Sequence, residues 1–246
     1  MRERAKKLIA TAAIVSLINL QAAGAAFAQV ASEVSTLNSW KSGAKGTQLG
    51  YQLLQLLDGS NRALTYNPRD KGALYRRGYL YGTIGCTQSA INDLTGAIQL
   101  DPYFAAAYTE RGICYMDQKN YQNALYDLNR AVQLDPRSGD ALFARGRANL
   151  ASGKTQLALA DFRATQWSVM KFHTTLPGEL PANHYDAPNY YLGACYEAMD
   201  KPDEALKYYK ASSKTPQTGT VGYLHRYADQ PLDTKYRISS LERTGY

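Results

Sequence analysis

The chain has 246 residues, of which 45% are hydrophobic and 20% are charged, and its formal net charge is +7. This composition is that of a folded globular protein and excludes a disordered or collagen-like chain. Tyrosine is over-represented, with 20 residues against 5 Phe and 2 Trp. Because the tyrosine ring packs on one side and its hydroxyl hydrogen-bonds at the tip, this bias is typical of half-buried or binding surfaces.

The first 28 residues have the three parts of a secretory signal peptide. Four basic residues and one acidic residue precede a short apolar run from Leu8 to Leu20, and Ala26-Phe27-Ala28 provides the small residues of a cleavage site. The run is shorter than the about 20 residues that span a bilayer, so an uncleaved membrane anchor is the less favoured interpretation. We expect cleavage after Ala28 and a periplasmic or secreted protein of bacterial type, with no membrane insertion after cleavage.

Removal of this segment lowers the net charge. It takes four of the 28 basic residues and one of the 21 acidic residues, so the mature chain keeps 24 against 20, or +4. A charge this small, together with export, argues against a nucleic-acid partner.

A period of 34 residues runs through the middle of the chain. Arg77-Gly78 recurs at Arg111-Gly112 and Arg145-Gly146, and Asp101-Pro102 recurs at Asp135-Pro136. Internal similarity at this period indicates a repeat architecture. Within each unit, the apolar residues follow helical spacing on both sides of a break, which predicts two helices per unit.

The period defines the expected organisation of the chain. We expect units at 71–104, 105–138 and 139–172, an insertion loop at 173–185, and a fourth unit at 186–219. Residues 220–246 are expected to form a C-terminal cap or tail. Residues 29–70 are expected to form an N-terminal helical segment, and whether it is a degenerate first repeat is left open because Leu56 occupies a slot that should be small.

The repeated pattern resembles that of the tetratricopeptide repeat family: Leu74…Gly78…Tyr81…Ala90…Leu94…Ala97…Pro102. The resemblance implies an all-α fold in which antiparallel helix pairs stack into a right-handed superhelix, an α-solenoid with an atypical end unit. The small Gly and Ala slots fit this fold, because two helices cross closely only where one side chain is nearly absent.

The resemblance also nominates partner-binding residues, because the first helix of each unit in this family lines a concave wall. Carried over by position, these are Tyr75, Thr109, Phe143 and Tyr190 in one row, Tyr79, Ile113 and Arg147 in the next, Met116 and Glu197 in a third, and Arg76 beside them. Tyr, Phe, Met and Arg are typical of interaction hot spots. The alternative is that these rings extend the core.

The implied function is a non-enzymatic scaffold or adaptor in the bacterial cell envelope, which binds a peptide or helix of an envelope protein in its concave groove. The sequence contains no phosphate loop, zinc-binding His-Glu-x-x-His or nucleophile elbow, and His173 and His184 are too loosely spaced for a metal site. We therefore expect no cofactor and no metal. The alternative is a cell-wall glycan- or peptide-acting enzyme or enzyme subunit, but its candidate carboxylates are scattered over different units: Glu110, Asp117, Asp140 and Glu197. Assembly into a homo-oligomer is a third hypothesis.

Repeating charges and cysteines have a structural and a functional interpretation. Each arginine of the period precedes an aspartate by 16 residues, as Arg77 precedes Asp93, which favours ion pairs that hold the helices together over a charged binding ladder. The cysteines are Cys86, Cys114 and Cys195, an odd number, so at least one does not pair within the chain. A disulfide between Cys86 and Cys114 is one hypothesis, and small core residues at Cys114 and Cys195 are the alternative.

Overall fold

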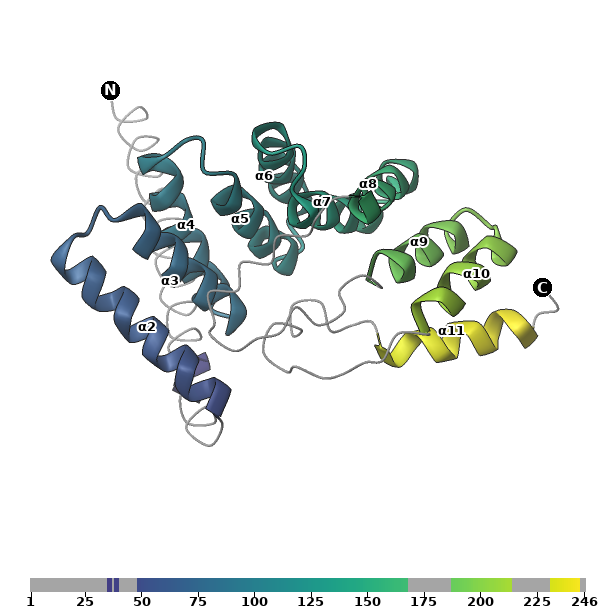
Figure 1. Ribbon diagram of the computed structural model, residues 1–246, viewed down its shortest axis with the longest axis horizontal. Helices are drawn as coiled ribbons and strands as arrows, with labels where there is room; N and C mark the ends of the chain where they lie inside the picture. Colours follow the sequence, from purple (N-terminus) through teal and green to yellow (C-terminus); the bar gives the residue numbers. More distant parts are fainter. Residues whose placement is uncertain (1–34, 37, 40–47, 168–186, 214–230, 244–246) are drawn as a thin grey trace, which may run out of the picture.

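The computed structural model describes residues 35–36, 38–39, 48–167, 187–213 and 231–243, and no residue in these ranges lies in a β-strand. The predicted all-α fold is confirmed. The helices are α2 (Gln48–Tyr66), α3 (Lys71–Thr83), α4 (Thr87–Leu100), α5 (Ala105–Asp117), α6 (Tyr121–Leu134), α7 (Gly139–Ala151), α8 (Thr155–Trp167), α9 (Ala187–Glu197), α10 (Pro202–Ser213) and α11 (Pro231–Arg243) (Figure 1). The predicted signal peptide at 1–28 and the predicted insertion at 173–185 lie outside the described residues.

Consecutive helices form pairs, and the pairs stack along the molecule. The closest contacts join α3 to α4, α5 to α6, α7 to α8 and α9 to α10. The second helix of each pair also packs against the first helix of the next, and the first helices α3, α5, α7 and α9 touch one another in turn. This is the arrangement of an α-solenoid, with the first helices as one continuous layer.

A glycine on each first helix allows the close crossing within a pair. A Cβ added at Gly78 would lie 2.9 Å from Cγ of Leu94, and one added at Gly193 would lie 2.7 Å from Cδ1 of Tyr209. Carbon atoms pack at about 3.5–4.0 Å, so a side chain at these positions would push the two helices apart. The repeating glycines are therefore set by helix packing.

The repeating arginines and aspartates form an ion pair inside each of the first three units, which confirms the structural interpretation. The Nε and Nη2 atoms of Arg77 donate to the two carboxylate oxygens of Asp93 at 2.6 and 2.7 Å. Arg111 and Asp127 repeat this geometry at 2.8 Å for both bonds, and Arg145 and Asp161 form the third pair. The hydrogen bond that Arg77 donates to Asp93 raises the pKa of the Arg77 guanidinium, against the opposing effect of burial.

The third guanidinium nitrogen of each arginine reaches back to the preceding second helix. Arg111 Nη1 donates to Thr95 Oγ1 at 3.0 Å, and Arg77 Nη1 donates to Asn61 Oδ1 at 3.1 Å. Asn61 and Thr95 are 34 residues apart. Helix α2 therefore occupies the place of a second helix that precedes α3.

Comparison of residues 34 positions apart also shows how α2 differs from a complete repeat. The turn between α3 and α4 spans residues 84–86, whereas the aligned residues 50–52 lie inside the 19-residue helix α2. A helical hairpin with its turn at this place is not formed. None of the described helices is both long and apolar enough to cross a membrane.

The proposed disulfide between Cys86 and Cys114 is not formed. The side chains of both cysteines are buried, as is that of Cys195. Cys114 belongs to a core cluster with Ala90 and Leu94, whereas Cys86 precedes the first residue of α4 and is not part of that cluster. Burial raises the pKa of the Cys195 thiol to about 12, which makes it an inert core residue.

Candidate functional site

The predicted wall residues lie on the first helices α3, α5, α7 and α9, but most of them are buried. The side chains between 2% and 8% exposed are Tyr75, Tyr79, Thr109, Ile113, Phe143 and Tyr190. The Tyr75 ring lies with its centroid 4.9 Å from that of Phe104, and the Phe143 ring lies 5.7 Å from that of Phe162. The six side chains extend the core, as the alternative interpretation stated, and their role as partner contacts stays a prediction.

Two predicted wall residues are half-buried, and one of them stands on a stack of rings. The Arg147 guanidinium lies 5.8 Å from the ring centroid of Tyr191. The Tyr191 ring stacks in turn on Phe162, with centroids 5.1 Å apart and planes 17° apart. Arg147 and Met116, on neighbouring first helices, both keep part of their surface accessible. This part of the wall has the Arg, Tyr and Met composition of an interface.

The other two predicted wall residues, Arg76 and Glu197, are exposed. The Glu197 carboxylate accepts hydrogen bonds from Tyr209 Oη at 2.6 Å and from Arg237 Nη1 at 2.5 Å. Glu197 therefore joins α9 to α10 and α11, which gives it a structural role. Arg76 lies at the opposite end of the first-helix layer, on α3.

The sequence analysis named Glu110 and Asp140 among carboxylates scattered over different units, but it missed that these two interact across neighbouring first helices. Asp140 lies in the first turn of α7, and Glu110 is buried on α5. Burial, and then the negative charge of Glu110, raise the pKa of the Asp140 carboxyl to about 7. Asp140 follows Glu110 by 30 positions, which is one 34-residue period less about one helical turn, and this spacing is the signal that could have revealed the pair.

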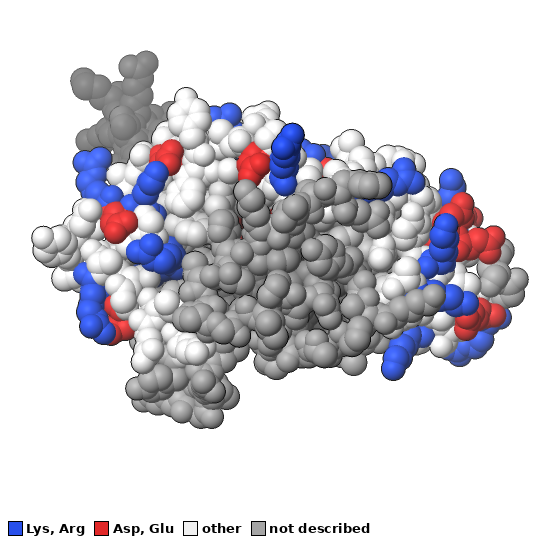
Figure 2. All heavy atoms as spheres, in the orientation of Figure 1, with Lys and Arg blue, Asp and Glu red and all other residues white. Residues whose placement is uncertain are grey.

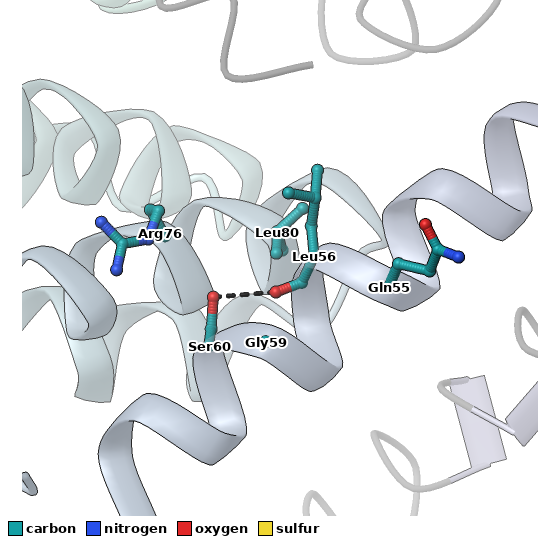
Figure 3. Close-up of a pocket in the computed structure, with 6 residues that line it drawn as sticks. All are labelled: Gln55, Leu56, Gly59, Ser60, Arg76 and Leu80. Atoms are coloured by element: carbon teal, nitrogen blue, oxygen red, sulfur yellow. Dashed lines mark hydrogen bonds between the residues drawn. The ribbon is translucent and has the colours of Figure 1, made fainter. Parts of the chain in front are cut away.

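A pocket of about 170 Å³ opens between α2 and α3 (Figure 3). Its lining residues are Gln55, Leu56, Gly59, Ser60, Arg76 and Leu80. The Ser60 hydroxyl donates to the Leu56 carbonyl oxygen at 2.9 Å, so it is satisfied within α2. Arg76 and Gln55 lie on opposite sides of the pocket in Figure 3, with the apolar residues between them.

Only Arg76 of these lining residues was predicted to contact a partner. The repeat pattern shows that Leu56 fills a slot that should be small, but it does not predict the pocket beside this residue. Around this end of the molecule and around α9–α11, basic and acidic side chains are intermixed (Figure 2). Among the described residues on this face, neither end shows a large patch of one charge that would dominate partner choice.

Comparisons with known proteins identify the repeats. Models of the tetratricopeptide repeat family match residues 105–138, 127–168 and 189–213. No curated protein matches the chain significantly. Among solved structures, a crystal structure of MamA is 25% identical, with a TM-score of 0.51, and the match covers 63% of this chain and 84% of that one.

Two further solved structures are similar in fold alone. A thermophilic tetratricopeptide-repeat protein of Thermus thermophilus is 20% identical with a TM-score of 0.51, and the match covers 76% of this chain and 89% of that one. The pilF protein of Pseudomonas aeruginosa is 19% identical with a TM-score of 0.54, and the match covers 72% of this chain and 71% of that one. With its stacked helix pairs and matching repeats, this chain is a tetratricopeptide-repeat protein.

Proposed function

We propose that the chain is a non-enzymatic scaffold of the bacterial cell envelope that binds a peptide or helix of a protein partner along the first-helix layer. Membership of the tetratricopeptide repeat family supports protein binding. The signal-peptide pattern of residues 1–28 supports the envelope location. The layer is formed by folding, so little ordering cost remains when a partner binds.

One observation carries the proposal: the stack of Arg147, Tyr191 and Phe162, together with the half-buried Met116 on the neighbouring first helix. The lower ring, Phe162, is fully buried, and Tyr191 is held on it with Arg147 above. A guanidinium and a ring that are already fixed lose little side-chain entropy on binding. Buried aromatic anchors and arginines are also the residue types that carry most binding energy at interfaces.

Site-specific photocrosslinking tests the proposal. We would place a photoreactive phenylalanine analogue at Met116 or Arg147, and at Tyr126 or Leu157 as controls. The control side chains are 74% and 58% exposed and lie on the second helices α6 and α8. We expect a protein crosslinked from the first pair and not from the second. Crosslinks from the controls alone would contradict binding along the first-helix layer.

The envelope location needs its own test. We expect the N-terminus of the protein purified from cells to be Gln29, and the protein to be released by osmotic shock. An intact Met1 in the membrane fraction would contradict cleavage and support a membrane anchor. Light scattering on the released protein measures the number of copies in one particle, which tests the proposed homo-oligomer.

In the part of the chain that the structure describes, the carboxyl pair Glu110 and Asp140 is the feature that favours the enzymatic alternative. A carboxyl group with a pKa near 7 beside a second carboxylate is the arrangement used for general acid and base catalysis. However, Glu110 is only 8% exposed, so a substrate would have to reach a buried group. We expect no hydrolysis of purified peptidoglycan by the mature protein, and turnover that Asp140→Asn abolishes would overturn the scaffold proposal.

A further inference from the structure

Helix α2 differs from the other second helices in the face that would contact a first helix of its own. In the next three units, the residues at two positions one turn apart are first alanine and then a large apolar residue, as in Ala90 and Leu94. In α2 the order is reversed, with Leu56 at the alanine position and Ser60 at the leucine position. Gly59 lies next to Ser60, at the position of Asp93. The reversal removes bulk where the other units are filled, and the pocket lies at this place.

The space beside Gly59 is large enough to hold a side chain. A Cβ added at Gly59 would meet no atom within 4 Å, whereas a Cβ added at Gly112 would lie 2.7 Å from Cγ of Leu128. The pocket volume of about 170 Å³ is close to the about 150 Å³ of an apolar cavity that holds a benzene ring. The pocket can therefore accept a side chain of the size of leucine or phenylalanine.

The residues that line the pocket indicate which group of the partner should lie next to this apolar side chain. Leu56 and Leu80 make the pocket apolar, and Ser60 adds no unsatisfied donor because its hydroxyl bonds within α2. Arg76 is exposed at one side, and Gln55 is exposed at the other. An apolar seat with a guanidinium at its rim favours an apolar side chain next to a carboxylate.

We propose that the pocket between α2 and α3 is a specificity site, which takes a large aliphatic or aromatic side chain of the protein partner while a neighbouring carboxylate of that partner binds Arg76. This inference rests on the proposed protein-binding function and names one chemical feature of the partner. Arg76 belongs both to the pocket and to the first helix α3, so the site continues the first-helix layer at its N-terminal end.

Three variants separate pocket filling from other effects. Gly59→Leu places a leucine side chain in the pocket. Gly59→Ala is the matched control, because alanine and leucine raise helix propensity over glycine by similar amounts, whereas alanine leaves most of the pocket open. Arg76→Gln keeps the length of the side chain and removes its charge.

The probe is a library of random twelve-residue peptides displayed on phage, selected on the full mature chain. We expect selected peptides to share a large apolar residue next to Asp or Glu and to bind the Gly59→Ala variant as they bind the unmodified chain. Affinity should fall at least about tenfold for Gly59→Leu and about tenfold for Arg76→Gln, as expected for loss of a charged hydrogen bond. Asparagine in place of the acidic residue should reproduce the loss seen with Arg76→Gln.

Equal affinity for Gly59→Leu, or failure to select any such peptide, would overturn the proposal. A second measurement tests whether the chain itself fills the pocket. In that case Gly59→Leu would displace the internal segment and lower the unfolding temperature below that of Gly59→Ala, which would also overturn the proposal. If crosslinks at Met116 persist when Gly59→Leu has no effect, only the pocket assignment fails and the scaffold function stands.

Discussion

The two ends of the described stack differ in how the outermost helix pair is covered. At the C-terminal end, Ile238 and Leu241 of α11 pack on the core formed by α7 to α10. Arg237 pairs with Glu197 at 2.5 Å, and α11 is tied to α10 by a second ion pair. At the N-terminal end, α2 and α3 leave an apolar pocket with exposed residues at its edges. One end, the closed end, is covered by a helix of the chain, and the described residues of the other end leave a pocket.

The difference shows how a repeat stack can be ended in two ways. A repeat unit cannot bury its own faces, so the terminal faces of a stack must be covered or altered. Helix α11 covers one face. Helix α2 alters the other, because Leu56 fills the slot that a close crossing needs and Gly59 replaces the aspartate that would bind an arginine. Helix α2 therefore lacks the small residue and the aspartate with which the next three second helices pack against their own first helices.

The largest expected effect comes from breaking a buried ion pair in the middle of the stack, between its two ends. In Asp127→Asn, the Arg111 guanidinium, with a side chain only 14% exposed, loses the charge of a carboxylate that is 1% exposed. Breaking a buried pair from one side costs about 3–5 kcal/mol. We expect the free energy of unfolding, measured by urea titration, to fall by this amount.

Asp58→Asn is the matched control for Asp127→Asn. Asp58 also pairs with an arginine, but the side chains of that pair are 79% and 59% exposed. Exposed pairs contribute about 0–1 kcal/mol, so a change of more than about 1 kcal/mol is not expected here. Equal losses in the two variants would contradict a structural role for the repeating pairs.

Removing one hydrogen bond between α9 and α10 at the C-terminal end should lower the free energy of unfolding by a smaller amount. Tyr209 is fully buried, and its hydroxyl donates to Glu197 at 2.6 Å. Tyr209→Phe keeps the ring and loses a hydrogen bond to a charged acceptor, which costs about 1.5 kcal/mol. Tyr126→Phe, at a side chain 74% exposed, should leave the unfolding midpoint unchanged. A loss in Tyr209→Phe no larger than in that control would show that the bond does not hold the closed end.

The sequence predicted the repeats because their spacing is set by contacts inside one unit. Gly78 and Arg77 each meet a residue 16 positions away in the next helix, so the period alone reveals both the crossing and the ion pair. Exposure was harder to predict, because it depends on residues that the period does not place. Tyr75 is buried partly by Phe104, which lies in the connection before α5. The predicted wall therefore included residues of the core.

The pocket could not be predicted from the spacing for a related reason. It arises where two residues depart from the repeat together, with Leu56 larger and Ser60 smaller than their counterparts. A single departure suggested a degenerate unit, and only the structure shows the space that the pair creates. Loss of bulk leaves no positive signal in a sequence pattern.

The free energy of unfolding should depend on pH because of the Asp140 carboxyl, which lies in the middle of the stack, away from both ends. The pKa of Asp140 is raised from 3.8 to about 7 in the folded state, first by burial and then by Glu110. The folded state therefore binds this proton more tightly than the unfolded state. The resulting stabilisation is complete below about pH 4 and is lost as the pH rises to about 7.

Asp140→Asn isolates this contribution. We expect the variant to gain stability relative to the unmodified chain as the pH rises from 4 to 7, with a constant difference above that range. Urea titrations at several pH values measure the difference. A difference that does not change with pH would show that the Asp140 carboxyl is not buried beside Glu110 in solution.

The smallest expected effect compares turns in a central unit and in the unit next to the closed end. The residues at the same place in four successive turns have positive φ: Gly85 (84°), Lys119 (58°), Gly153 (74°) and Asp200 (57°). A residue with a Cβ in this conformation costs about 1–2 kcal/mol, which the larger entropy loss of glycine on folding partly offsets. We expect Lys119→Gly and Asp200→Gly to raise the free energy of unfolding by about 0.5–1 kcal/mol each.

Hydrogen exchange of α10 and α11 amides would show whether the gain in Asp200→Gly is confined to the closed end, because a repeat contacts only its neighbours. A gain that spreads evenly to α3 and α4 would instead mean that the stack unfolds as one unit and that its two ends are not energetically separate.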